Sequence, residues 1–121
     1  MLPFNSNRNS ATNSLLKTDR RGAAFWGRDL LNTIGQIEVN STTVDQFSRL
    51  TNIPDIDILK IDVQGAEYSV LNGARNKLQD QRISLIYTEL ILCPTYEKQK
   101  RLRDYFSLLE GFGYVFLNFF N

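Results

Sequence analysis

The most regular pattern of hydrophobic and polar positions lies in the middle of the chain, where apolar and polar side chains alternate over residues 57–63. Such alternation predicts a strand, because successive side chains of a strand point to opposite faces. One face carries Leu59, Ile61 and Val63, and the other carries Ile58, Lys60 and Asp62. Apolar residues therefore occur on both faces near its start, which is typical of a central strand in a parallel sheet.

A turn and a helix are predicted directly after this strand. Gln64-Gly65 supplies the turn, and apolar residues then recur at helical spacing over residues 66–79. Gly73 inside the helix costs about 1 kcal/mol relative to alanine, so its presence indicates close packing against a neighbouring element. The predicted buried stripe consists of Val70, Leu71, Ala74 and Leu78, with Glu67 one turn earlier on the same stripe.

The part of the chain before this unit has a weaker pattern. Residues 1–29 are rich in Asn, Ser, Thr and Arg and keep no period, so they are interpreted as an irregular, solvated and mildly basic segment. Residues 37–39 favour a short strand. Thr43 and Gln46 then have capping-box spacing, which predicts a helix to about residue 50. Its expected buried residues are Val44, Phe47 and Leu50.

The part after the unit continues the alternation of strands and helices. The pattern predicts a buried strand over residues 83–92, a helix from Thr95 to about residue 110, and an aromatic strand over residues 114–120. Alternating strands and helices imply an α/β fold with a mostly parallel, open sheet and flanking helices.

Composition limits the chemistry. The 121 residues include 14 Lys+Arg and 13 Asp+Glu, so the formal net charge of +1 argues against binding to nucleic acid or to an anionic membrane. The chain has no histidine, which excludes histidine-activated nucleophiles and histidine-ligated zinc. The single Cys93 fits a reducing compartment, and no apolar stretch is long enough for a membrane helix, so we expect a soluble cytoplasmic protein. Cys93 itself is interpreted as a small buried hydrophobe rather than a nucleophile.

Candidate chemistry gathers where the two central strands end, because ligands of open α/β sheets bind outside the carboxyl ends of their strands. Asp62, Gln64 and Glu67 follow the first strand, and Glu89 lies along the second. Two acidic groups at a helix start would repel a phosphate and suit a neutral or cationic ligand. An alternative is structural, since Glu67 favours the helix dipole and Asp62 can cap the helix. The residue types leave both interpretations open.

Lys60 shares a strand face with Asp62. A lysine in a buried strand needs a partner, so we expect it to pair with the carboxylate of Asp62 or Glu89. Such pairing favours a structural role for Lys60 over direct catalysis.

The central block resembles a known family. Residues 56–67 read IDILKIDVQGAE and residues 70–74 read VLNGA. The block is similar to the signature of the FkbM methyltransferases, approximately I-D-x-L-K-I-D-x-E-G-A-E followed by V-L-x-G-A. Gln64 stands where that family more often has Glu. Weaker similarities occur at residues 39–47, at Tyr87-Thr88-Glu89 and at Gly113-Tyr114.

The resemblance implies a Rossmann-like class I fold that binds S-adenosylmethionine and methylates a hydroxyl of a sugar, glycan or other small metabolite, with no metal required. Residues 30–121 would form the C-terminal half of the methyltransferase domain, after its glycine-rich cofactor loop. The implied catalytic residues are Asp62, Lys60 and Glu89, and the implied cofactor-binding residues are Asp62, Gln64 and Glu67. Positioning would supply most of the rate, and a base would add about 10²–10⁴-fold.

A half-domain has a physical consequence. The strand at residues 56–63 would lack its neighbour and would expose an apolar sheet edge, so we expect self-association through that edge. Two further hypotheses follow from the same observation: a non-catalytic α/β interaction module, and a gene remnant without function.

Overall fold

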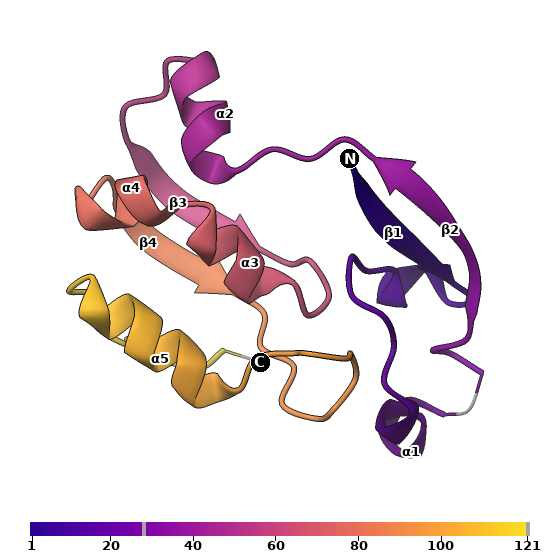
Figure 1. The fold of residues 1–121 in the computed structure, drawn as a ribbon. Helices are drawn as coiled ribbons and strands as arrows, with labels where there is room; N and C mark the ends of the chain where they lie inside the picture. Colours follow the sequence, from indigo (N-terminus) through magenta and orange to yellow (C-terminus); the bar gives the residue numbers. More distant parts are fainter. Residues whose placement is uncertain (28, 121) are drawn as a thin grey trace.

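The computed structural model describes residues 1–27 and 29–120 and contains two small sheets of two strands each (Figure 1). Strand β1 (Leu2–Asn7) pairs antiparallel with β2 (Thr33–Val39), and β3 (Ile56–Ile61) pairs parallel with β4 (Ile83–Thr88). The α/β class and the neighbouring parallel strands agree with the sequence analysis. The larger parallel sheet does not occur within the described residues, because β1 and β2 form a separate antiparallel ribbon.

Residues 1–29 were expected to be irregular, but they contain regular elements. Besides β1 they contain the 3-10 helices η1 (Ser10–Thr12) and η2 (Arg20–Gly22) and the short helix α1 (Ala23–Trp26). Buried asparagines replace the missing apolar residues, since Asn5 and Asn7 are 4% and 2% exposed. Their side-chain amides donate to the carbonyls of Leu16 at 3.0 Å and Thr12 at 2.6 Å. A hydrophobic pattern does not detect a segment that is ordered by polar contacts.

Helix α2 (Val44–Leu50) begins where the capping spacing predicted, because the Thr43 hydroxyl accepts a hydrogen bond from the Gln46 amide at 3.1 Å. Of the three residues predicted to be buried, only Val44 packs against the core, where it is half-buried. Phe47 and Leu50 are 52% and 70% exposed, whereas Ser48 is buried. The helix packs at its start and on the Ser48 side, so Phe47 and Leu50 remain in solvent.

The helix predicted over residues 66–79 is two helices, α3 (Glu67–Asn72) and α4 (Arg75–Gln79). The Gly73 carbonyl accepts the Asp45 amide at 2.9 Å, and the Asp45 carboxylate accepts the backbone amides of Asn76 and Lys77 at 2.9 and 3.0 Å. Asp45 therefore caps α4 from another element. The predicted close approach at Gly73 is confirmed, since a Cβ there would lie 3.0 Å from the Thr43 Cβ.

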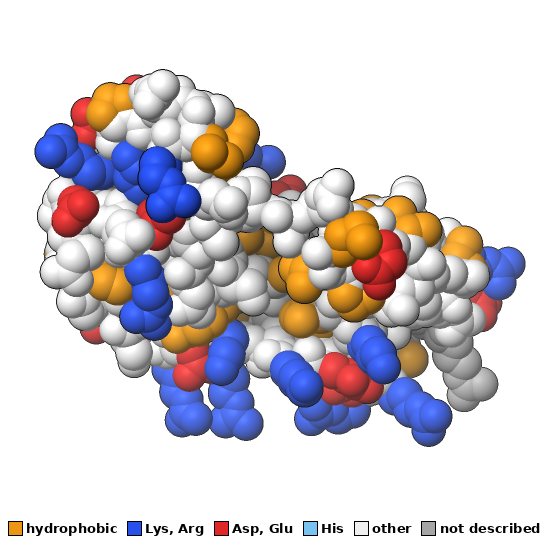
Figure 2. All heavy atoms as spheres, turned by 45° about the horizontal axis from the view of Figure 1, so that its top comes forward, with side chains coloured by type: hydrophobic (Ala, Val, Ile, Leu, Met, Phe, Trp, Pro, Cys, Tyr) orange, Lys and Arg blue, Asp and Glu red, His pale blue; other side chains and the backbone are white. Residues whose placement is uncertain are grey.

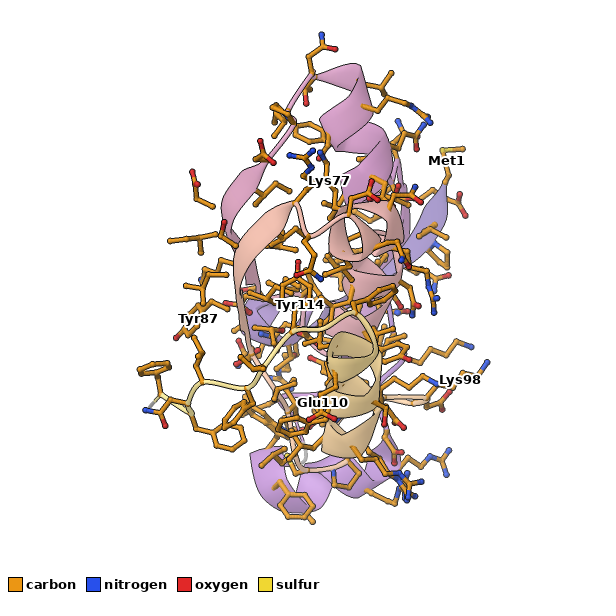
Figure 3. The ribbon with its side chains drawn as sticks, turned by 90° about the vertical axis from the view of Figure 1, so that its left-hand side faces the viewer. Met1, Lys77, Tyr87, Lys98, Glu110 and Tyr114 are labelled. Atoms are coloured by element: carbon orange, nitrogen blue, oxygen red, sulfur yellow. The ribbon has the colours of Figure 1, made fainter. Side chains whose placement is uncertain are left out.

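The hydrophobic core lies between the β3–β4 pair and helices α3, α4 and α5 (Leu102–Gly111), which cover one face of the pair (Figure 1). Its buried apolar residues are Ile61, Leu71, Tyr105, Ala74, Leu78 and Ile83. The opposite face, called the open face below, carries Ile58, Lys60, Leu85 and Tyr87. Figure 3 shows Tyr87 pointing away from the helices. The expectation of apolar burial on both faces was therefore wrong.

The C-terminal third also differs from its prediction. Strand β4 ends at Thr88 and α5 begins only at Leu102. Residues 95–101, which were predicted to be helical, form a loop. The Gln99 side chain organises this loop by accepting the amides of Thr95 and Tyr96 at 3.2 and 3.1 Å. Residues 114–120 have no regular secondary structure. Their aromatic side chains contact one another, α5 and β4 without forming a strand, as in the Phe106–Phe116 ring pair at 5.2 Å and the Tyr87–Phe120 ring pair at 6.4 Å.

Within the described ranges 1–27 and 29–120, no helix is both long enough and apolar enough to cross a lipid bilayer.

Candidate functional site

The carboxyl ends of β3 and β4 bring three predicted site residues together. Asp62 directly follows β3 and Glu89 directly follows β4, and the Glu89 amide donates to the Ile61 carbonyl at 3.0 Å. The Gln64 side-chain amide Nε2 spans the two carboxylates, donating to Asp62 Oδ1 at 3.1 Å and Glu89 Oε2 at 3.0 Å. We call Asp62, Gln64 and Glu89 the strand-end cluster. All three were expected from the sequence to lie at this edge.

The electrostatics of the cluster act mainly on Glu89. Partial burial raises the pKa of the Glu89 carboxyl, and the negative charges of Asp62 and Glu67 raise it further. The hydrogen bond from Gln64 opposes this shift, because it stabilises the charged form. The hydrogen bonds from the Gln64 amide therefore offset part of the repulsion between the neighbouring Asp62 and Glu89 carboxylates.

Glu67 lies beneath the cluster, inside the protein. Its side chain is 1% exposed, and Oε1 accepts the backbone amides of Val63 at 3.2 Å and Gly65 at 3.1 Å. Both donors belong to the turn between β3 and α3. The carboxylate thus closes that turn from within and faces protein rather than solvent. The alternative that Asp62 caps the helix was wrong, because no side chain caps α3.

Lys60 is the site residue whose surroundings were mispredicted. Its side chain is 65% exposed on the open face, and its Nζ lies 3.7 Å from Asp62 Oδ2. The pairing with Asp62 is confirmed, whereas the expected burial is not, because no helix covers that face among the described residues. An ion pair this exposed contributes only about 0–1 kcal/mol to stability.

The turn itself has an unusual backbone. Gln64 has φ 52° and Gly65 has φ 92°, so two consecutive residues occupy the left-handed region. Gly65 meets the Tyr96 ring, since a Cβ built on Gly65 would lie 2.6 Å from Tyr96 Cδ2. A glycine is required here both for its conformational freedom and for the space that the ring fills.

Sequence reasoning missed the residues that contact this turn from outside. Ser14 Oγ donates to the Gln64 carbonyl at 2.7 Å, and Tyr96 OH donates to the Thr12 carbonyl at 2.9 Å. Burial and the nearby charges of Glu67 and Glu89 raise the pKa of Tyr96 to about 12. These contacts join positions 50 and 84 residues apart, so no local pattern signals them. The N-terminal segment is therefore part of the site's surroundings.

An open groove lies elsewhere, between α2 and α4. It is lined by side chains of both charges, including Asp45, Arg49, Lys77 and Arg82. Lys77 already donates to the Ile53 carbonyl at 2.8 Å, and Arg82 to Asp55 at 3.1 Å. We therefore place the candidate site at the strand-end cluster, where the carboxylates converge.

Comparison with known proteins gives two matches. The family described as the methyltransferase FkbM domain matches residues 3–116. A 2-O-methyltransferase, NoeI, from Sinorhizobium fredii (strain NBRC 101917 / NGR234) is 36% identical over 81 residues, which are 67% of this chain and 32% of that protein. The chain thus spans about a third of the length of this curated relative. No solved structure matches the chain. The match over residues 3–116, together with the central block that contains Asp62 and Gln64 of the strand-end cluster, shows that this chain belongs to the FkbM methyltransferase family.

Proposed function

We propose that this chain forms part of an S-adenosylmethionine-dependent methyltransferase that transfers a methyl group to a hydroxyl of a sugar or small metabolite. The observation that supports this proposal most is the strand-end cluster, in which Gln64 holds the Asp62 and Glu89 carboxylates side by side at the carboxyl edge of a parallel strand pair. That edge is where α/β sheets bind ligands.

The residues at this edge suit the proposed cofactor. When bound, S-adenosylmethionine supplies the methyl group and carries a positive charge on its sulfur. The carboxylates of Asp62 and Glu89 provide negative charge toward such a group, and both residues are exposed to solvent. In this proposal Asp62 and Gln64 hold the cofactor, while Glu67 contributes by keeping the turn in place through its two backbone hydrogen bonds.

Glu89 is the proposed general base. A carboxyl whose pKa is raised accepts a proton more readily than an ordinary carboxylate, so the Glu89 carboxylate is suited to take the proton of an acceptor hydroxyl. Lys60 lies 3.7 Å from Asp62 and orients that carboxylate. Asp62, Lys60 and Glu89 are thus the proposed catalytic set.

For the molecule that accepts the methyl group we propose only a chemical class. The matched relative is called a 2-O-methyltransferase, and a hydroxyl acceptor on a sugar or glycan is consistent with that name. The net charge of +1 does not favour nucleic acid or membrane partners. A cytoplasmic location belongs to the same proposal, supported by the single unpaired thiol of Cys93.

Calorimetry with S-adenosylmethionine and with its demethylated product tests the proposal. We expect micromolar binding to the wild-type chain and a loss of about tenfold or more in Asp62→Asn, a change of about 1.4 kcal/mol. Asp57→Asn is the matched control, because Asp57 is an exposed carboxylate near the other end of β3. Equal affinity in Asp62→Asn and the control, or no binding to the wild-type chain, would contradict the proposal.

A non-catalytic interaction module is a second candidate, favoured by the apolar surface. Ile58 on the open face is 63% exposed, and Ile34 and Ile37 on β2 are 71% and 58% exposed. Figure 2 shows hydrophobic side chains gathered over β1 and β2, at the right of the view. Self-association through the open edge of β3, which pairs only with β4 among the described residues, is proposed with it. A saturable dimer in sedimentation velocity without cofactor binding would favour this candidate, and a monomer would count against it.

A further inference from the structure

The backbone conformation of Gln64 needs an explanation outside the turn. Residues with a side chain avoid the left-handed region, and a glutamine there is uncommon. Gln64 nevertheless has φ 52°, and its amide reaches both strand-end carboxylates from that conformation. Something must hold the residue in this arrangement.

One contact comes from the N-terminal segment. The Ser14 hydroxyl donates to the Gln64 carbonyl at 2.7 Å, and Ser14 is 1% exposed. Ser14 is itself anchored to β1, because its backbone exchanges two hydrogen bonds with Asn5 at 2.8 and 3.2 Å. The direction of the Gln64 carbonyl is therefore determined by a residue 50 positions earlier in the chain.

A second contact comes from the loop after β4. Tyr96 is 2% exposed, and its ring fills the space beside Gly65. Its hydroxyl donates to the Thr12 carbonyl at 2.9 Å and lies 3.5 Å from Gln64 Oε1. Tyr96 thus meets the backbone of the turn, the amide oxygen of Gln64 and the N-terminal segment at once.

We infer that Ser14 and Tyr96 are positioning residues of the methyl-transfer site, because together they hold Gln64 so that its amide spans the Asp62 and Glu89 carboxylates. The inference rests on the proposed function of that cluster. Neither residue needs to touch a ligand. If the carbonyl of Gln64 is released, the backbone relaxes from the left-handed region, the amide leaves the two carboxylates, and their mutual repulsion is no longer offset.

The first measurement uses the ligand-free chain. The pKa of Glu89 is read by carbon-13 NMR of its carboxyl in the wild type and in Ser14→Ala, Tyr96→Phe and Gln64→Met. Loss of the Gln64 donor favours the neutral form of Glu89, so we expect its pKa to rise by about half a unit or more in all three variants. Tyr114→Phe is the matched control, since it removes another tyrosine hydroxyl that donates to a backbone carbonyl, that of Ile83 at 2.8 Å.

The second measurement is the calorimetric affinity for the demethylated cofactor product in the same four variants. We expect a loss of about tenfold in Ser14→Ala and Tyr96→Phe and no change in Tyr114→Phe. The comparison is made at a temperature where amide NMR spectra show each variant folded. If Ser14→Ala does not fold, Tyr96→Phe decides, because it removes a single oxygen atom.

The two measurements separate the inference from the proposed function. A raised Glu89 pKa in the variants of a chain that binds no cofactor would uphold the positioning of the carboxylates and overturn the methyltransferase proposal. An unshifted Glu89 pKa in Tyr96→Phe, with Gln64→Met shifted, would overturn the positioning inference, whatever the chain binds.

Discussion

Removing the buried carboxylate of Glu67 is the sharpest test of how the turn is held. Glu67 Oε1 accepts the amides of Val63 and Gly65 at 3.2 and 3.1 Å and is out of solvent. Glu67→Ala leaves both amides without this acceptor, and hydrogen bonds to a charged group contribute about 1.5–3 kcal/mol each. We therefore expect a loss of about 3–6 kcal/mol in the free energy of unfolding, a large part of the roughly 5–15 kcal/mol of a typical domain.

Glu67→Gln refines the test, because it keeps an oxygen where the two amides need one. Neutral hydrogen bonds contribute about 1 kcal/mol each, so the expected loss is smaller than in Glu67→Ala, about 1–4 kcal/mol. Urea unfolding monitored by circular dichroism and by Trp26 fluorescence gives both values. Glu110→Ala is the control, since Glu110 is exposed on α5. If Glu67→Ala loses no more stability than Glu110→Ala while cofactor binding disappears, Glu67 acts on a ligand and our structural assignment is wrong.

Three further predictions follow from the same region. Gly65→Ala is expected to lower the free energy of unfolding by about 2–4 kcal/mol, because φ is 92° and the new Cβ would lie 2.6 Å from the Tyr96 ring. Gly111→Ala is the control: the space around Gly111 is open, so this variant should be neutral or stabilising in the same urea assay. Because the pKa of Glu89 is raised, the folded chain keeps the Glu89 proton to a higher pH than the unfolded chain, so the protonated carboxyl stabilises the fold at low pH and this contribution is lost as the pH rises. The stability of Glu89→Gln relative to wild type should therefore increase between pH 4 and pH 7. A series of thermal melts in which this difference decreases with pH would contradict the prediction. Burial raises the pKa of Tyr96 and Tyr105 to about 12, so absorbance titration should show a late phase that disappears in urea, and stability should fall as the pH rises from 10 to 12.

Several features were predictable because they depend on residues close together in the chain. Thr43 begins α2 through a hydrogen bond three residues ahead, and the 57–63 alternation predicted β3. The convergence of Asp62 and Glu89 was also predictable, since residues at the carboxyl ends of adjacent parallel strands meet at one edge. Composition and motif thus sufficed for the strand, the turn and the carboxylates of the candidate site.

Tertiary structure alone decided the features that depend on partners far away in the sequence. Strand β1 forms because β2 and buried asparagine contacts replace apolar packing, and the predicted 66–79 helix breaks because Asp45 caps α4 from another element. Lys60 is exposed because helices cover only the opposite face of its strand. The hold of Ser14 and Tyr96 on Gln64 likewise spans 50 and 32 residues. Local propensity does not predict such contacts, because they form and contribute to stability only after folding has brought the two segments together.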